Sequence, residues 1–152
     1  MTSYCIQDNY PDQYCNCYGC GKNNQYGLKI RSFWDGQKAT ARFRPDSWHI
    51  ALPGYVYGGL IASLVDCHGI ATASAAMAEA DGHDQKQLMR YVTASLHVDY
   101  HRPTPMGETL TITGTALKAE KSRVTVDVEI FARGKLRARG RVVAAPIPRS
   151  MS

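Results

Sequence analysis

The sequence lacks long uninterrupted apolar runs, internal repeats and low-complexity tracts. Its most apolar stretch, residues 60–78, contains Asp66 and His68 and is otherwise rich in Ala, Ser, Thr and Gly. A membrane span would exclude the carboxylate and favour Leu, Ile and Phe, so we expect a buried helix here and no membrane partner. With 152 residues and no repeat, the chain is expected to form one domain.

Charge of one sign is not concentrated anywhere in the chain. Lys and Arg number 18 and Asp and Glu number 13, which gives a formal net charge of +5, and no block of like charges occurs. An excess of this size helps an anionic ligand to approach the protein. It is too diffuse to indicate nucleic acid, so we expect no nucleic-acid partner.

The first residues show no basic segment followed by an apolar one, as a secretory leader would. The five cysteines are an odd number, which argues against a disulfide framework and for a reducing, cytoplasmic setting. Cys15, Cys17 and Cys20, with Cys5 upstream, could hold zinc, since Cys-x-x-Cys-Gly resembles half of a zinc ribbon. No second pair with this spacing follows, so we predict no metal site. Cys67 is expected to be a small core residue.

The pattern of apolar residues divides the chain into an irregular cysteine-rich segment (1–25), a single domain (26–147) and a tail (148–152). A long helix is predicted from about residue 58 to residue 80, after a loop rich in Pro and Gly. Alternating residues predict two strands before the helix and four after it, at 27–33, 38–43, 90–101, 109–119, 124–130 and 136–142. This order indicates an α+β fold in which an antiparallel sheet carries a helix on one face.

The side chains of the last two predicted strands also predict the register in which these strands pair. Pairing Ile130 with Leu136 makes residues 132–134 a three-residue loop with glycine at its left-handed position. This register also pairs acidic with basic side chains, Glu129 with Arg137 and Asp127 with Arg139. Cross-strand pairs of this kind account for half of a basic stripe that alternates along the last strand and consists of Lys135, Arg137, Arg139 and Arg141. The alternative is that the stripe binds an anion.

Asp66 is the first chemical clue, because its neighbours on the predicted helix are apolar. A carboxylate in such surroundings is costly unless it is hydrogen-bonded or functional. Burial also tends to raise the pKa of a carboxylate, which suits a general base. The structural alternative is that Asp66 lies on an exposed strip of the helix, with Ser63 and His68 nearby.

The start of the helix is the second clue. Gly58 and Gly59 present bare backbone N–H groups at a helix N-terminus, which stabilise negative charge such as an oxyanion. Close packing or a tight turn is the alternative reason for two glycines. Asp66 lies eight residues beyond Gly58, about 12 Å along the helix, so one reacting carbonyl cannot touch both. If both serve one reaction, each must come from a different subunit, which predicts a dimer.

Several short motifs occur in a fixed order: Cys17-Tyr-Gly-Cys20-Gly21, Asn24 with Gly27-Leu28, the segment 53–66, the segment 93–100, Arg102-Pro103 and Gly107-Glu108. From about Cys17 to Ala145 the chain therefore resembles the hotdog-fold thioesterases of the phenylacetate-pathway (PaaI-like) and human thioesterase-superfamily-member type. The resemblance implies a long helix wrapped by a curved antiparallel sheet. It also implies a homodimer or a dimer of dimers, with two sheets joined edge to edge.

The activity implied by this resemblance is hydrolysis of an acyl-CoA thioester without a metal or organic cofactor. In similar enzymes the carboxylate at the position of Asp66 is the general base or nucleophile. The N–H at the position of Gly58 polarises the carbonyl, and a hydroxyl at the position of Thr93 helps to place water. His49 lies where some relatives carry a polar side chain near the thioester. Tyr57 stands where the family usually has histidine, which suggests an altered specificity.

Further residues are predicted to contact the substrate. Gly59 and Ser63 lie on the same helix, and the phosphates of coenzyme A are expected near Arg90, Arg102 or Arg123, because these bases fall near strand ends. The alternative function is that of a non-catalytic protein that binds acyl-CoA in the same cleft. A hydratase of the same fold would carry a histidine five residues after its aspartate, and neither Asp46 nor Asp66 has one.

His97, Asp99 and His101 alternate along one predicted strand and so share one of its faces. Such a set could hold a metal, but a solvated polar face accounts for it more simply. We therefore predict no metal there either.

Overall fold

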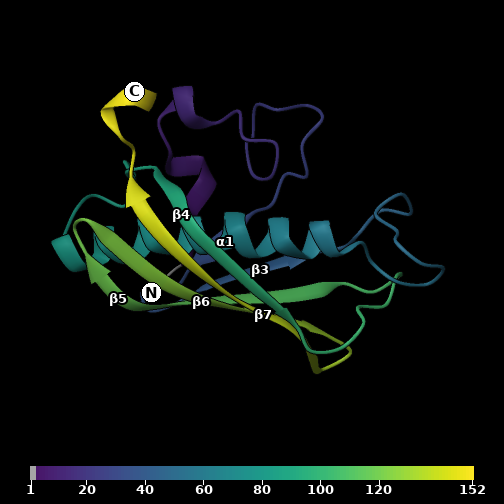
Figure 1. The fold of residues 1–152 in the computed structure, drawn as a ribbon. Coiled ribbons are helices and arrows are strands. Elements are labelled where there is room, and N and C mark those ends of the chain that lie inside the picture. The colour runs from purple at the N-terminus through teal and green to yellow at the C-terminus, as the bar shows by residue number, and fades with distance from the viewer. Residues whose placement is uncertain (1–2) are drawn as a thin grey trace.

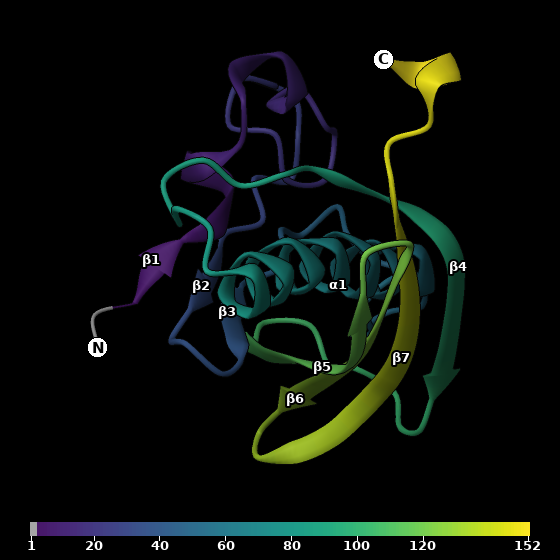
Figure 2. The same cartoon turned by 90° about the vertical axis from the view of Figure 1, so that its left-hand side faces the viewer.

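The computed structural model describes residues 3–152 and shows one long helix lying in a strongly curved antiparallel sheet (Figures 1 and 2). The helix is α1 (Gly58–Asp81), and three short 3-10 helices are η1 (Ile6–Asn9), η2 (Asp12–Tyr14) and η3 (Arg149–Met151). The strands are β1 (Tyr4–Cys5), β2 (Ser32–Trp34), β3 (Ala39–Phe43), β4 (Tyr91–Tyr100), β5 (Leu110–Glu120), β6 (Arg123–Ala132) and β7 (Lys135–Pro146). They form one sheet of seven strands in the order β1-β2-β3-β5-β6-β7-β4. The predicted α+β hotdog arrangement is confirmed.

Helix α1 is the centre of the core. It begins directly after the extended residue Tyr57 and ends at Gly82, which has a left-handed φ of 66° and donates to the carbonyls of Ala78 and Glu79. The helix is long and apolar enough to cross a membrane, but 83% of its most apolar window is buried inside the fold, as expected of a core helix. The predicted helix is therefore confirmed to within one residue at each end.

Three glycines let α1 approach the sheet closely. A Cβ atom on Gly140 of β7 would lie 2.3 Å from Cγ1 of Val65, and one on Gly114 of β5 would lie 2.2 Å from Oγ1 of Thr72. On the helix itself, a Cβ at Gly69 would lie 2.5 Å from Cγ2 of Val142. Real Cβ atoms do not come this close to other atoms, so glycine is required wherever the helix crosses these strands.

The N-terminal segment covers the side of α1 that faces away from the sheet (Figure 2). Although it was expected to be irregular, it forms β1, η1 and η2 and contributes to a second apolar cluster. In this cluster Ile6, Tyr10 and Cys15 pack with residues of β2, β3 and α1 and with Leu88. The cysteine-rich start therefore belongs to the packed core.

The strand predicted at 27–33 is wrong for most of its length, because β2 covers only Ser32–Trp34. The N–H of Leu28 donates to the carbonyl of Tyr18 at 2.8 Å, and that of Ile30 donates to Gly19 at 3.0 Å. Lys29 between them has a positive φ of 57°. These backbone groups hold the cysteine loop, so they are not available to a neighbouring strand.

The predicted register of the β6–β7 hairpin is also wrong. Ile130 lies opposite Ala138, and the connection is a two-residue turn in which Arg133 and Gly134 both have positive φ. Such a turn matches the twist of the strands, and the shift of register between Ile130 and Phe131 leaves Arg137 as the extra residue of a bulge.

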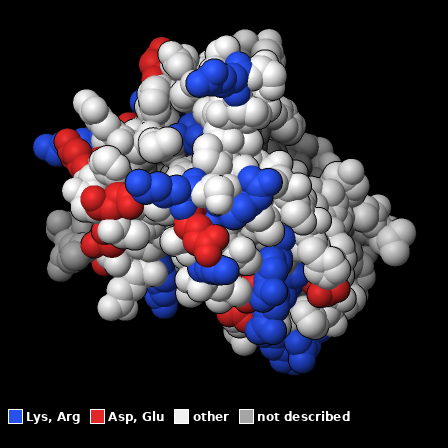
Figure 3. All heavy atoms as spheres, turned by 60° about the vertical axis from the view of Figure 1, so that its left-hand side comes forward, with Lys and Arg blue, Asp and Glu red and all other residues white. Residues whose placement is uncertain are grey.

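The observed ion pairs of this hairpin are Arg139 with Glu129 at 2.5 Å and Arg141 with Asp127 at 2.8 Å. Two of the four bases of the stripe are therefore paired across the strands, as predicted, but with other partners. Figure 3 shows basic and acidic groups interspersed over much of one face. Exposed pairs of this kind contribute little to stability.

His68 lies in a fully buried polar network rather than on an exposed strip. Its Nδ1 is 2.8 Å from Oγ of Ser32, and its Nε2 is 3.2 Å from the carbonyl oxygen of Ala39. Because a carbonyl can only accept, Nε2 carries the proton and Nδ1 accepts from Ser32. Oγ of Ser32 in turn accepts from the amide of Gln7 at 3.2 Å, which ties η1 to the helix. Burial lowers the pKa of His68 to about 4.

Stability should fall as the pH drops from about 6.5 toward about 4, because the unfolded chain binds a proton at His68 that the folded chain excludes. We expect this histidine to remove about 2 kcal/mol of unfolding free energy between pH 7 and pH 5. Urea unfolding of the wild type and of His68→Gln at both pH values measures the effect. Equal losses of free energy in the two proteins would contradict it.

Gly140→Ala should destabilise the fold by about 1–3 kcal/mol, because the added methyl group overlaps Val65. Val65→Ala removes the overlapping atom, so the double variant should be more stable than the sum of the two single changes predicts. A thermodynamic cycle from urea unfolding measures this coupling. Strict additivity would show that the close approach of α1 does not depend on Gly140.

Candidate functional site

Asp66 lies on a narrow strip of α1 that is only partly covered. The strip follows the helical repeat through Gly59, Ala62, Ser63 and Asp66, whereas the residues on either side of Asp66 are buried. Ser63 uses its hydroxyl to donate to the carbonyl of Gly59 at 2.9 Å. The sequence left open whether Asp66 is buried or lies on an exposed strip, and within one chain Asp66 and Ser63 lie on a partly exposed strip.

Thr93 holds the carboxylate of Asp66. Its Oγ1 donates a hydrogen bond to Oδ1 of Asp66 at 2.5 Å. No other group in residues 3–152 donates a hydrogen bond to Asp66, so its second oxygen, Oδ2, remains available for chemistry. The two predicted residues are brought together by different elements, α1 and β4.

A bulge in β4 makes this contact possible. Strict alternation along β4 would put Thr93 on the same face as Ser95 and His97, but the observed register does not. Thr93 lies opposite Ala144 and Ser95 lies opposite Val143, so Ala94 is an extra residue. Both Thr93 and Leu96 consequently face the helix. Without the bulge, one of the two would point away from α1.

The first backbone N–H groups of α1 are free to bind a ligand. Leu60 and Ile61 both donate to the carbonyl of Tyr57, but within the described chain the N–H groups of Gly58 and Gly59 have no acceptor. The hydroxyl of Tyr100, near the end of β4, donates to the carbonyl of Gly58 at 2.7 Å. This bond fixes the helix start against the sheet and involves the carbonyl of Gly58, not its N–H group.

His49 and Tyr57 flank the helix start. The N–H of Tyr57 donates to the carbonyl of His49 at 2.9 Å, and Nδ1 of His49 accepts from the N–H of Asp46 at 2.9 Å. The neutral imidazole therefore carries its proton on Nε2, which can donate to a ligand. The Tyr57 ring lies over Gly59, where a Cβ atom would be 2.3 Å from its Cζ.

The predicted bases for the substrate phosphates are not brought together in one chain. Arg90 precedes β4 and stacks over the ring of Tyr10, with 5.3 Å between the guanidinium carbon and the ring centroid. Arg102 follows β4 and donates to the carbonyl of Leu136 at 2.8 Å. The ten residues of β4 separate them by roughly 33 Å. Arg123 is the exposed first residue of β6.

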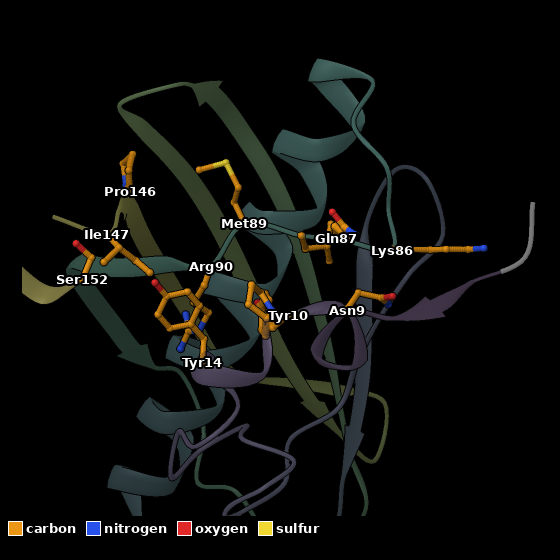
Figure 4. A pocket seen from close by; sticks show the side chains of 12 residues that line it. Asn9, Tyr10, Tyr14, Lys86, Gln87, Met89, Arg90, Pro146, Ile147 and Ser152 are labelled. Carbon is orange, nitrogen blue, oxygen red and sulfur yellow. The ribbon is translucent and has the colours of Figure 1, made fainter. Parts of the chain in front are cut away.

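One hollow of the described chain lies away from Asp66. It has a volume of about 650 Å³ and is lined by both terminal segments and the residues before β4, including Tyr10, Lys86 and Arg90 (Figure 4). Asp66, Thr93 and Gly58 do not line it. Within residues 3–152, this hollow and the predicted catalytic residues are therefore in different places.

Three thiols meet on the opposite side of α1 from the sheet. The sulfur atoms of Cys17, Cys20 and Cys67 all lie within 4.8 Å of one another. Hydrogen bonds from the thiols of Cys20 and Cys67 lower the pKa of Cys17. Cys67 was expected to be only a core residue, and its partners are about 50 residues away in the sequence, so no local pattern could have revealed the cluster.

Residues 53–139, more than half of the chain, match the family model of the thioesterase superfamily. The chain belongs to this superfamily. The matched region contains Gly58, Asp66 and Thr93. It therefore includes both the start of helix α1 and the hydrogen bond between Thr93 and Asp66. None of the curated proteins gives a significant match.

Solved structures agree with this membership. A thioesterase superfamily protein from Shewanella loihica PV-4 is 40% identical, aligns over 90% of this chain and 98% of its own, and has a TM-score of 0.69. The Escherichia coli PaaI protein from the phenylacetic acid degradation operon is 21% identical over 80% of this chain and 81% of its own, with a TM-score of 0.65. The smu.793 protein from Streptococcus mutans, solved bound to acetyl CoA, is 16% identical over 73% and 82%, with a TM-score of 0.61.

Proposed function

We propose that this protein hydrolyses acyl-CoA thioesters as a homodimer, with Asp66 as general base or nucleophile. The observation that carries the proposal is the 2.5 Å hydrogen bond from Thr93 to Asp66 on the partly covered strip of the core helix. A carboxylate held by one oxygen, with the other free, is placed to act on a bound carbonyl. Membership of the thioesterase superfamily supports a thioester as that carbonyl compound.

The edge strand β4 supports the dimer. One side of β4 pairs with β7, and its other side has no neighbouring strand in the sheet. It is ten residues long, contains no proline, and leaves Leu96 and Tyr100 40% and 55% exposed. A long edge strand with exposed apolar side chains is a template for pairing with another strand, which a second copy of the chain would supply.

Antiparallel pairing of β4 with the β4 of a second copy would unite the two halves of the site. One end of β4 holds Asp66 through Thr93, and the other end holds Gly58 through Tyr100. A two-fold axis near the middle of the strand would bring Thr93 close to Tyr100 of the partner subunit. Asp66 would then face the free N–H of Gly58 of the partner subunit, although the two lie about 12 Å apart within one chain.

The same pairing would bring the scattered bases together. Arg90 and Arg102 flank β4 at its two ends, so the two-fold axis would place Arg90 near Arg102 of the partner subunit. We propose that these bases, with Arg123, bind the phosphates of coenzyme A. His49 through Nε2, Gly59 and Ser63 would line the reacting part of the substrate beside Tyr57. The acetyl CoA bound to the S. mutans protein supports this class of ligand.

The proposed reaction needs only these groups. As water bonds to the carbonyl carbon, its proton passes to Oδ2 of Asp66, and the carbonyl electron pair moves onto oxygen, where the partner's Gly58 N–H stabilises it. Collapse of this intermediate breaks the C–S bond, and the proton held by Asp66 passes to the leaving thiolate. The products are the acid and free coenzyme A. If Asp66 is the nucleophile, an anhydride forms first and is then hydrolysed.

A non-catalytic acyl-CoA-binding protein is the second candidate. The observation that favours it is the ring of Tyr57, which packs over Gly59 at the position where the family usually has histidine. A phenol there would still leave the cleft able to hold a thioester. The two candidate functions differ in whether Asp66 catalyses hydrolysis of the bound thioester.

Asp66→Asn should lower kcat/KM by about 10²–10⁴-fold, because the amide accepts the hydrogen bond of Thr93 but cannot take up a proton. Release of free thiol from short, medium, long and aryl acyl-CoA substrates measures turnover, and binding of the same panel by calorimetry is the control. Binding without turnover by the wild type would instead support the second candidate. Turnover that survives in Asp66→Asn would remove Asp66 from the mechanism.

Gly58→Pro should lower kcat by about 10²–10³-fold, because it removes the oxyanion donor. Proline is tolerated at the first position of a helix, and Tyr57 already has the extended ψ of 129° that suits a residue before proline. Gly58→Ala is the matched control, since its Cβ would lie 3.6 Å from Tyr100 and its N–H remains.

Mixing Gly58→Pro with Asp66→Asn tests the shared site directly. Each mixed dimer would regain one complete site, built from Asp66 of one protomer and the Gly58 N–H of its partner. With free exchange, activity should therefore rise to about a quarter of the wild-type value. No recovery, in a sample where mass spectrometry shows mixed dimers, would place both groups of each site in the same chain.

A further inference from the structure

We propose that Cys17, Cys20 and Cys67 bind one Zn²⁺ ion that fastens the N-terminal segment to helix α1. Their three sulfur atoms lie within 4.8 Å of one another, and those of Cys17 and Cys67 are 3.9 Å apart. A tetrahedral zinc ion with Zn–S bonds of about 2.3 Å places two ligand sulfurs about 3.8 Å apart. The spacing of Cys17 and Cys67 therefore matches a shared metal ion better than a disulfide, in which the sulfurs are about 2 Å apart.

The cysteine loop is shaped around this meeting point. A Cβ atom at Gly19 would lie 2.3 Å from Sγ of Cys67, so glycine is needed for the helix thiol to enter the loop. The N–H of Gly21 donates to the carbonyl of Cys17 at 2.7 Å and closes the turn.

The charge around the cluster is suited to a metal thiolate. Zn²⁺ with three thiolates carries a net charge of −1. The half-buried Arg90 can balance it, because its neighbours that can carry negative charge are the phenol of Tyr10 and the three thiols. None of these described neighbours of Arg90 is a carboxylate. The thiols, as thiolates, would therefore supply its counter-charge.

The fourth zinc position would be filled by water. Cys20 and Cys67 are buried, but Cys17 is partly exposed and lines a hollow of about 210 Å³ together with Arg90 and Val92. Three protein ligands with water in the fourth position is the arrangement of zinc sites that keep one position open. The ion would lie beside Cys67, one residue from Asp66, and would hold that part of α1 against the covering segment.

Metal content of the intact protein, expressed with added zinc and purified by gel filtration, tests the site. The wild type should contain about one zinc ion per chain by mass spectrometry, and Cys17→Ser, Cys20→Ser and Cys67→Ser should each lose about tenfold or more of it. Cys15→Ser and Cys5→Ser are matched controls. Both cysteines are buried in the same segment but lie outside the cluster, so these variants should keep the metal.

Cobalt supplies a readout that does not depend on the variants being folded. Co²⁺ added to the metal-free wild type should give thiolate-to-cobalt absorption and the visible bands of a tetrahedral site, and added Zn²⁺ should abolish both. The same metal should raise the thermal midpoint of the protein. The proposal fails if the wild type contains no stoichiometric metal and shows no cobalt spectrum while all five thiols titrate freely. It also fails if Cys15→Ser loses the metal as completely as Cys17→Ser.

Discussion

The close approach of helix α1 to the sheet is the constraint on which the rest of the structure depends. Where the helix crosses β5 and β7, three glycines have no side chain and leave room for a neighbour. Gly69 leaves room for Val142, Gly114 for Thr72 and Gly140 for Val65. Because the helix lies so deep in the curved sheet, 15 of its 24 residues are buried, and the N-terminal segment packs against some of them. The strip that stays partly open is the one beside the edge strand, and it carries Asp66.

Much of the fold could be predicted because local patterns determine it. The period of the helix and the alternation of the strands located α1 and the strands after it to within about two residues, except that β7 continues to Pro146, beyond its predicted end at 142. The rest of the fold could not be predicted, because contacts between distant segments determine it. The backbone of Leu28 and Ile30 is used by the cysteine loop, which removes most of the first predicted strand. Ala94 and Arg137 are bulge residues, and one extra residue shifts a register without changing the residue types that predict a strand.

The candidate site also has a part that local patterns predict and a part that depends on contacts between distant segments. Asp66 and Gly58 stand out in the sequence because a carboxylate and two glycines are unusual in such a helix. Placing His68 on the same strip as Asp66 was wrong, because residues two apart on a helix point about 200° apart, and His68 faces the sheet. The hydrogen bond between Thr93 and Asp66 follows from the bulge at Ala94, and the thiol cluster joins segments that only the fold brings together.

The division of the site between the two ends of β4 links assembly to activity under the proposed pairing. A single chain has its carboxylate and its free helix N–H groups about 12 Å apart, and it exposes an apolar edge strand beside them. Pairing would cover that edge, shield the strip with Asp66 from bulk water and supply the missing N–H in one step. Selection for a buried edge and selection for a complete site would therefore act on the same strand. A substitution that weakens β4 pairing would lower activity even when it touches neither Asp66 nor Gly58.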